Sequence, residues 1–511
     1  MVNRVAALAG LLAGLSTSLA GAQEPLSVID WLSENPPVVG PPVIAPNEPP
    51  VSDSAKRPEI TVRTLDAARS PIGLVPPSVT GLPQTLWRGS ETEVLTRLIS
   101  NAPVSRSPAM QTLLYTLILS EAAPLPTVRA DEAVLLARID RLIQLGAIDP
   151  AQSLIEQAGA DRNAEVFRRA FETALLIGSE DKRCETLLDQ PHLSPGLDAQ
   201  IFCTARAGDL TAASVMFDGA RALGMMPADT TDALDRFLYP EVFEEAAPLP
   251  VPNDPDPLLF RLFEAIGEPL PSAPLPRAFA AADLRDLAGW KAQLEAAERL
   301  ARTGALSTNR LLGLYTARLP AASGGVWDRV EALQRFETAL RTRSPTAVSR
   351  TLRQAWRAMK EASLEVPFAA LFAEPLSNVR LNDPDLARLQ LRIALLSPGY
   401  ETAANRIASA GPESAFWAGL AQGQPESAPP PTAQAEAIAL AFEPDPELPD
   451  NLSAETLGET ILRLMVLFDR GVGGNMQDLT EAIAGFRALG LEDTARRASL
   501  QALLLERGPV Q

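Results

Sequence analysis

A four-residue pattern recurs along this chain and separates stretches whose apolar residues have the spacing of α-helices. In each copy a glycine is followed, three residues later, by Asp, Ser or Thr. The copies are Gly146-Ala147-Ile148-Asp149, Gly178-Ser179-Glu180-Asp181, Gly208-Asp209-Leu210-Thr211, Gly304-Ala305-Leu306-Ser307 and Gly490-Leu491-Glu492-Asp493. Glycine tolerates the left-handed backbone conformation at a helix C-terminus, and the polar side chain can cap the next helix. Each copy therefore predicts a junction between two helices.

The stretches beside the first junction carry helical periodicity. Between residues 131 and 145 the apolar positions are Leu135, Leu136, Ile139, Leu142 and Ile143. After the turn they are Ala151, Leu154, Ile155 and Ala158. Spacings of one, three and four residues place such side chains on one face of a helix. The pattern predicts two amphipathic helices joined by a tight turn.

The spacing of the junctions is also regular. Gly146, Gly178 and Gly208 are 32 and 30 residues apart, and the two later glycines follow after gaps close to three and six such units. A period of about 31 to 34 residues with two helices per unit is typical of stacked helical hairpins. With small residues after the turn at Ala151 and Ala213, the chain resembles a degenerate tetratricopeptide-type α-solenoid, although that family's Trp, Leu-Gly and Tyr consensus is absent. The resemblance implies an all-α superhelical stack of hairpins, and the alternative is an irregular helical bundle.

Changes in composition divide the chain into five segments. They are a signal peptide (1–22), a proline-rich tail and linker with a short amphipathic segment (23–83), an α-helical solenoid (84–423), a proline-rich linker (424–452) and a C-terminal helical unit (453–511). The second linker is predicted from its low-complexity stretch of Ser, Ala and Pro and the acidic-proline run that follows. The C-terminal unit is predicted to pack as a cap on the solenoid.

The first 22 residues have the three parts of a cleavable secretory signal peptide. Arg4 supplies a positive charge, an apolar stretch runs from Val5 to Leu15, and Ala20-Gly21-Ala22 provides small residues at the cleavage site. An uncleaved anchor is the alternative, but about 11 apolar residues fall short of the roughly 20 that span a bilayer. Because no cysteine follows the apolar run, a lipoprotein anchor is not expected at this site. We expect a periplasmic protein without an integral membrane span, with secretion as the alternative.

A short segment after the signal peptide has the apolar spacing of an amphipathic helix. Leu26, Ile29 and Leu32 recur at helical spacing with Trp31 beside them, but the segment is too short to be a stable helix alone. Residues 36–58 then hold eight prolines, which predicts an extended, disordered tail. Together they resemble a tethered docking peptide with Trp31 as a partner contact. The alternatives are disorder, or a segment that folds back on its own domain.

The chain has two cysteines, Cys184 and Cys203, in neighbouring helical stretches. An exported protein meets an oxidising compartment in which such a pair can form a disulfide. The turn at residues 190–196 would let two antiparallel helices bring the sulfurs together. The alternative is a pair of buried free thiols, and a redox-active role is disfavoured because there is no C-x-x-C motif.

Charge argues against two classes of partner. The formal net charge is -18, only four of the 45 basic residues are lysines, and no basic block occurs. Nucleic acids and anionic lipid surfaces both require clustered positive charge. We therefore expect no nucleic-acid partner, and the sequence leaves the oligomeric state open.

The chain carries no motif that predicts catalysis, a cofactor or a metal. Its one histidine, His192, rules out zinc sites built on two histidines and histidine-based nucleophile triads. Ser179-Glu180-Asp181-Lys182 matches the S-x-x-K of penicillin-binding enzymes, but S-D-N and K-T-G elements are missing. Gly471-Val472-Gly473-Gly474 lacks the preceding strand and lysine of a phosphate-binding loop. We predict that the protein is not an enzyme and binds no cofactor.

One loop combines backbone freedom with aromatic and basic side chains. The stretch Leu319 to Trp327 joins two strong helical patterns, with Tyr315 and Arg318 before it and Arg329 after it. Trp, Tyr and Arg contribute much of the binding energy at protein interfaces. We therefore name Tyr315, Arg318, Trp327 and Arg329 as candidate partner contacts, and the alternative is that Trp327 is a core residue at the start of the next helix.

These features favour a non-catalytic periplasmic scaffold or adaptor that binds a protein partner in a cell-envelope assembly. Stacked hairpins form extended grooves that bind peptides or helices. The alternative is an envelope protein that acts on peptidoglycan or binds glycan strands, with carboxylates that the sequence does not single out.

Overall fold

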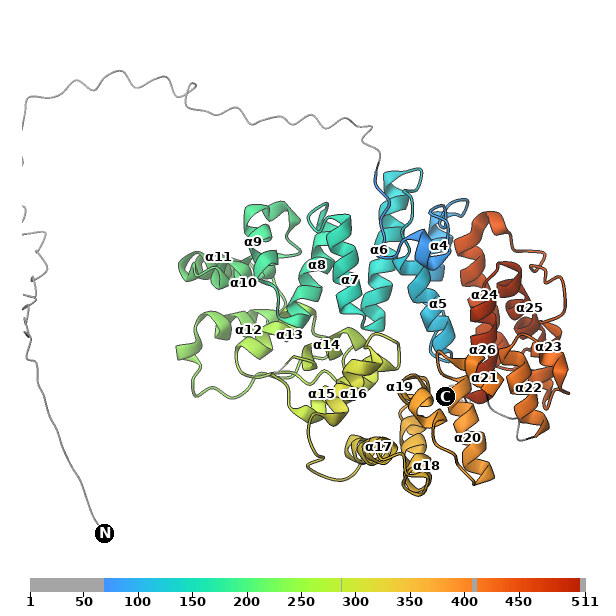
Figure 1. Ribbon diagram of the computed structural model, residues 1–511. Helices are drawn as coiled ribbons and strands as arrows, with labels where there is room; N and C mark the ends of the chain where they lie inside the picture. The colour runs from blue at the N-terminus through green and yellow to red at the C-terminus, as the bar shows by residue number, and fades with distance from the viewer. Residues whose placement is uncertain (1–68, 286, 407–410, 506–511) are drawn as a thin grey trace, which may run out of the picture. The chain divides into compact units, whose positions relative to one another are not determined.

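The computed structural model describes residues 69–285, 287–406 and 411–505, and their regular structure is helical (Figure 1). The all-α prediction is confirmed: these residues contain no β-strand, only isolated bridges between Ile72 and Ala122 and between Val75 and Ser120. The described residues belong to one compact unit. The predicted signal peptide, most of the proline-rich tail and Trp31 lie outside the described residues.

The described part of the chain contains 24 α-helices. The first twelve are α3 Pro77–Thr80, α4 Thr92–Asn101, α5 Pro108–Leu119, α6 Val128–Leu145, α7 Ile148–Ala158, α8 Ala164–Ile177, α9 Asp181–Asp189, α10 Leu197–Arg206, α11 Leu210–Ala222, α12 Ala228–Leu238, α13 Pro257–Ala265 and α14 Ala280–Asp283. The others are α15 Trp290–Ala301, α16 Thr308–Thr316, α17 Val326–Arg341, α18 Pro345–Glu361, α19 Glu365–Ser377, α20 Pro384–Leu395, α21 Tyr400–Arg406, α22 Pro412–Ala421, α23 Ala433–Leu440, α24 Leu457–Val472, α25 Met476–Ala488 and α26 Glu492–Leu504. Short 3-10 helices cover Pro191–Leu193, Pro240–Val242, Arg277–Phe279, Pro425–Ser427 and Ala454–Thr456.

The predicted glycine junctions are confirmed. All five glycines have positive φ, and each lies between two helices: Gly146 (80°), Gly178 (70°), Gly208 (92°), Gly304 (70°) and Gly490 (76°). The capping side chains were predicted correctly only after Gly304, where Ser307 accepts a hydrogen bond from the amide of Arg310.

At the other four junctions the predicted caps are wrong, because the helices begin earlier than expected. After Gly208 the cap is Asp209. Asp149, Asp181 and Asp493 lie within the first turns of α7, α9 and α26. There their negative charges interact favourably with the positive end of the helix dipole.

The helices pack around two hydrophobic cores. The larger core takes residues from α4–α8 and from α15 to the end of α26, and the smaller one takes residues mainly from α8–α14. Consecutive helices pack as pairs, among them α10 with α11, α17 with α18, and α24 with α25. In addition α24 packs on α4 and α26 packs on α5, so the last helices lie beside the first ones (Figure 1).

The segment predicted as the second linker, residues 424–452, contains α23, which packs on α25. The Oγ1 atom of Thr480 donates to the carbonyl of Ala437 at 2.9 Å. Separately, none of the helices described here is both long and apolar enough to cross a bilayer.

Candidate functional site

An apolar hollow of about 500 Å³ is formed along one face of α5. This helix begins with Pro108 after Ser107, whose side chain accepts from the amide of Met110. Its inner residues pack in the larger core, and a second face that carries several polar side chains is left for the hollow. The α5 residues that line the hollow are Pro108, Gln111, Thr112, Tyr115, Thr116 and Leu119. Steps of three and four residues place them on a single face of the helix.

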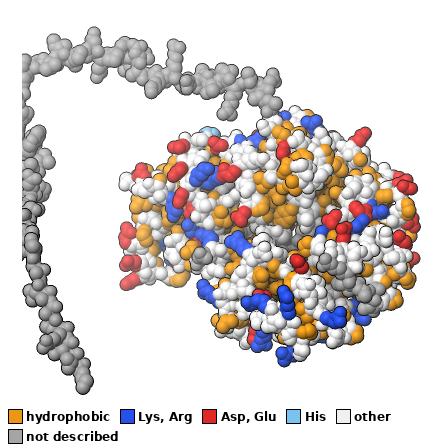
Figure 2. All heavy atoms as spheres, viewed as in Figure 1, with side chains coloured by type: hydrophobic (Ala, Val, Ile, Leu, Met, Phe, Trp, Pro, Cys, Tyr) orange, Lys and Arg blue, Asp and Glu red, His pale blue; other side chains and the backbone are white. Residues whose placement is uncertain are grey.

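Opposite α5, helix α19 lines two cavities in succession. Val366, Pro367 and Ala370 line the first cavity, of about 500 Å³. Ala370 also lines the second, of about 370 Å³, together with Ala373. The two cavities share Ala370 as a lining residue, and we call this pair the α5–α19 groove. Figure 2 shows hydrophobic side chains gathered over the region of α5 and α6.

The turn between α15 and α16 forms a third side of the groove. Gly304 has φ +70°, and a Cβ atom there would lie 3.4 Å from Cε2 of Tyr115. Glycine therefore provides the left-handed conformation at this turn, and the tyrosine ring lies at ordinary contact distance from it. Gln111 donates through Nε2 to the carbonyl of Arg302 at 2.8 Å, and Nε of Arg302 donates to the carbonyl of Ala362 at 2.7 Å. These bonds fix α5, the α15–α16 turn and the start of α19 relative to one another.

The charge at the groove has one sign in its first cavity. Among the described residues that line this cavity, Arg302 is charged and no side chain is a carboxylate. This is unusual for a chain with 63 acidic and 45 basic residues. An acidic ligand would therefore meet no carboxylate in the first cavity. Arg302 also pairs with Glu298 at 3.3 Å, and Glu374 lines the second cavity.

Further arginines lie behind the same wall. Arg277 packs against the α6–α7 turn, where its Cγ lies 3.1 Å from the Cβ position of Gly146. Its pKa is lowered by burial and, further, by the neighbouring Arg302, whereas Tyr115 acts in the opposite direction. Burial also lowers the pKa of Arg141, and Arg277 lowers it further. Within the described chain Arg277 has no ion-pair or hydrogen-bond partner, so its charge is left uncompensated beside Tyr115.

The phenol of Tyr115 is a polar group of this wall. Its hydroxyl is buried and has no hydrogen-bond partner among the described residues. Burial raises the pKa of Tyr115, and nearby Arg277 and Arg141 oppose that rise. The group is therefore neutral at physiological pH and can still donate a hydrogen bond.

The predicted contacts around residues 315–329 lie partly inside the protein. Tyr315 is 1% exposed and donates to Oε1 of Glu298 at 2.6 Å. Arg329 donates two hydrogen bonds to the same carboxylate, from Nε to Oε1 at 2.7 Å and from Nη2 to Oε2 at 2.6 Å. Trp327 is the second residue of α17, and its ring centroid lies 5.1 Å from that of Trp290. These three side chains join α15, α16 and α17.

Arg318 is the one residue of this group that is exposed. Its backbone carbonyl accepts a hydrogen bond from Nε2 of Gln334 at 2.7 Å. The loop after it also exposes Leu319, at 82%. The structure thus brings Tyr315, Trp327 and Arg329 together as packing residues, and leaves Arg318 and Leu319 at the surface.

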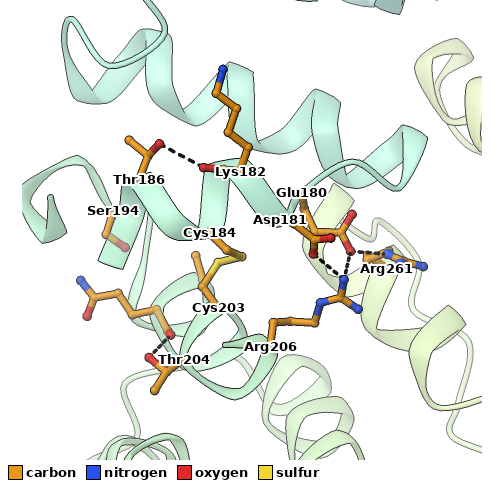
Figure 3. Close-up of a disulfide and its surroundings, with 12 residues drawn as sticks. Glu180, Asp181, Lys182, Cys184, Thr186, Ser194, Cys203, Thr204, Arg206 and Arg261 are labelled. Atoms are coloured by element: carbon orange, nitrogen blue, oxygen red, sulfur yellow. Dashed lines mark hydrogen bonds and ion pairs between the residues drawn. A yellow bond between two sulfur atoms is a disulfide. The ribbon is translucent and has the colours of Figure 1, made fainter. Parts of the chain in front are cut away.

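The predicted disulfide between Cys184 and Cys203 is present (Figure 3). It joins α9 to α10, and both cysteines are buried, at 4% and 0% exposure. Beside it, Glu180 is 1% exposed and accepts from Nε of Arg261 at 3.0 Å, with Arg206 at 3.6 Å. Both arginines contact Oε1, whereas the buried Oε2 of Glu180 has no hydrogen-bond partner among the described residues. This cluster is a structural link within the smaller core.

A second wide hollow, of about 620 Å³, lies between α25 and residues 440–451. Its acidic lining residues are Glu443, Asp445, Glu447, Asp450 and Glu481. No group of three or more His, Cys, Asp or Glu side chains in the described ranges has the arrangement of a metal site. We therefore take the α5–α19 groove as the candidate site.

The sequence analysis did not single out the groove residues. Aromatic and basic side chains mark an interface in a sequence, whereas the groove is lined mainly by Thr, Ala, Val and Pro. One signal was present: Pro108–Leu119 is apolar on more than one face, which exceeds what a helix on the surface of a single core needs. Comparison with models of protein families, with characterised proteins and with solved structures found no match for this chain.

Proposed function

We propose that this protein is a non-catalytic scaffold of the bacterial cell envelope and that it binds a segment of another protein in the α5–α19 groove. The observation that carries the proposal is the groove itself, an apolar channel whose first cavity has Arg302 but no carboxylate among its described lining residues. Its volume of about 500 Å³ is within the range of ligand sites, about 300 to 1,000 Å³. The signal-peptide pattern at residues 1–22 supports an exported, periplasmic location.

The occupant that fits these walls is a polypeptide segment with an apolar face and acidic flanks. A helix laid in an apolar groove is a recurring mode of peptide recognition. The groove follows α5 from Pro108 to Leu119, which corresponds to about 17 Å at the rise of an α-helix. A partner helix of about ten residues matches that length, and its carboxylates would pair with Arg302.

A tetratricopeptide-like stacking of hairpins is part of this proposal. It is supported by the near-regular spacing of Gly146, Gly178 and Gly208 and by the packing of consecutive helices in pairs. The packing of α24 and α26 against α4 and α5 distinguishes this arrangement from an open superhelix. In the proposed scaffold the binding surface is therefore a groove of limited length.

The proposal can be tested with a photo-crosslinking amino acid placed at Thr112 in living cells. Thr112 lines the groove and is exposed, so substitution there leaves the core intact. We expect one or a few polypeptide adducts, and a synthetic peptide from the crosslinked segment should bind the purified protein.

Ala370→Glu provides the groove variant for that binding measurement. Ala370 is exposed, and a carboxylate there would repel an acidic peptide. Ala222→Glu, on the exposed end of α11, adds the same charge away from the groove. We expect Ala370→Glu to weaken peptide binding at least about tenfold and Ala222→Glu to leave it unchanged. Equal binding by both variants would refute the groove as the site, and co-sedimentation of the protein with purified cell-wall sacculi would favour the glycan-binding alternative.

A further inference from the structure

A group of cationic side chains lies behind the wall that α5 and the α15–α16 turn form. Tyr115 packs against Gly304 in that turn, where its Cε2 lies 3.4 Å from the Cβ position of the glycine. The neighbouring Thr303 donates through Oγ1 to the carbonyl of Leu145 at 2.8 Å. This bond joins the turn to the end of α6, and the stem of Arg277 packs against the α6–α7 turn that follows. Tyr115 and Arg277 therefore lie at the same junction.

Arg141 adds a second positive charge to this junction. It precedes Leu145 by four residues, so the two lie on the same face of α6. Its guanidinium donates to two backbone carbonyls at the end of α4. Burial raises the pKa of Tyr115, and Arg277 and Arg141 both oppose that rise, which shows that the two charges are close to the phenol.

Three polar groups at the junction have no partner in the described chain. The hydroxyl of Tyr115 and Nε of Arg141 are buried, and neither has a hydrogen-bond partner among the described residues. Arg277 has neither an ion pair nor a hydrogen bond there. No carboxylate is among the groups that shift the pKa of Arg141 or Arg277. Buried donors and charges without partners cost free energy, so a ligand that accepts from all three would stabilise the folded protein.

The neighbouring arginines are held in place. Arg299 donates to two backbone carbonyls, at 2.9 and 2.7 Å. Arg302 pairs with Glu298 at 3.3 Å and donates to a further carbonyl at 2.7 Å. The guanidinium of Arg277 is therefore the one of this group that is free to turn. Tyr115 also lines the first cavity of the groove, so a small ligand can reach the junction from that cavity when Arg277 turns aside.

We propose that a small dianion, inorganic phosphate, binds between Tyr115, Arg141 and Arg277. Two guanidinium charges without a carboxylate match the two charges of the ligand, and the planar fork of arginine matches the geometry of phosphate oxygens. The phenol is neutral at physiological pH and donates its proton to a third oxygen. This site is independent of the proposed scaffold function, because phosphate binding and partner adducts at Thr112 are measured separately and either can be found without the other.

The test is the binding of inorganic phosphate to the purified full chain, measured by isothermal titration calorimetry at constant ionic strength. Arg277→Met removes the charge and keeps an unbranched stem against the α6–α7 turn. Arg350→Met, at an exposed position of α18, removes the same charge elsewhere. We expect the parent and Arg350→Met to bind one phosphate per chain with equal affinity, and Arg277→Met to bind at least about tenfold more weakly.

A second variant keeps the test valid if Arg277→Met does not fold. Tyr115→Phe deletes one oxygen that has no partner in the described chain, so it should fold as the parent does and still weaken phosphate binding. In phosphate-free buffer we expect Arg277→Met to raise the midpoint of urea unfolding, because Arg277 lies beside Arg302 without a carboxylate of its own. Phosphate should raise that midpoint more in the parent than in the variant.

Two outcomes would overturn the proposal. One is the absence of saturable phosphate binding by the parent up to on the order of 10 mM. The other is equal phosphate binding by the parent and by whichever of Arg277→Met and Tyr115→Phe is folded. If Arg277→Met also lowered the urea midpoint while phosphate binding stayed unchanged, the guanidinium would serve packing alone.

Discussion

Replacing Glu298 by glutamine tests whether the α15–α17 cluster holds this part of the protein together. The carboxylate is 1% exposed, and it receives hydrogen bonds from Tyr315, from both Nε and Nη2 of Arg329, and from Arg302 at 3.3 Å. Glutamine has nearly the same shape but removes the negative charge. Its amide group would also present donors to a guanidinium that has only donors.

The expected cost follows from the burial of the partners. Removing one member of a buried ion pair costs about 3 to 5 kcal/mol, because the other charge is left uncompensated. The Arg329 side chain keeps 20% exposure, so water recovers part of its hydration. We therefore expect Glu298→Gln to lower the free energy of unfolding by about 2 to 4 kcal/mol.

Urea unfolding followed by tryptophan fluorescence measures this change, since Trp290 and Trp327 lie on the same helices as Glu298 and Arg329. Glu295→Gln is the matched control on α15: its pair with Lys291, at 3.6 Å, is at the surface and should be worth at most about 0.5 kcal/mol. Adding Arg329→Met to Glu298→Gln should restore part of the loss. If Glu298→Gln and Glu295→Gln differed by less than about 0.5 kcal/mol, the reasoning about the buried charge would be refuted.

Three further predictions concern the disulfide, a turn and the tyrosines. Cys203→Ala should lower stability by about 3 kcal/mol, from a loop closed over a separation of 19 residues, and the denatured, unreduced parent should show no free thiol in a thiol assay; two thiols would contradict the bond. Gly146→Ala should cost more unfolding free energy than Gly208→Ala, because both glycines have positive φ but only the Cβ at residue 146 would clash with another side chain, that of Leu300; equal costs would contradict this. Burial raises the pKa of three of the four tyrosines. They are Tyr115, Tyr315 and Tyr400. Above about pH 10 the unfolded chain loses these protons while the folded protein keeps them, so stability should fall as pH rises, and most tyrosinate absorbance should appear only with unfolding; its appearance in the folded protein would contradict the prediction.

Local chemistry made the helix junctions predictable. A left-handed residue at a helix end depends on its own backbone, so the five glycines could be recognised from sequence alone. The start of the next helix depends on tertiary packing as well. Ile148 is 3% exposed and packs in the smaller core, and α7 begins at this residue. Asp149 therefore lies inside the helix and does not cap it.

The disulfide was predictable for a similar reason, since only two cysteines had to be paired, across one short turn. The candidate contacts at residues 315–329 show what sequence cannot supply. Tyr315 and Arg329 have the residue types of an interface, but their common partner Glu298 lies 17 and 31 residues away in sequence. No local pattern in the sequence reveals that the buried Glu298 carboxylate on α15 binds both side chains.

The groove could not be predicted from the sequence, because its walls come from segments that are far apart in the chain. The start of α5 is held by Gln501 on α26, whose Oε1 accepts from the amide of Ala109 at 2.7 Å and from the hydroxyl of Ser107 at 3.2 Å. Gln501 is 8% exposed, so these bonds are shielded from water. The far wall is α19, which is tied to α5 through Gln111 and Arg302. A terminal helix of the chain thus fixes one end of the groove, and the C-terminal helices contribute to the site's geometry as well as to the core.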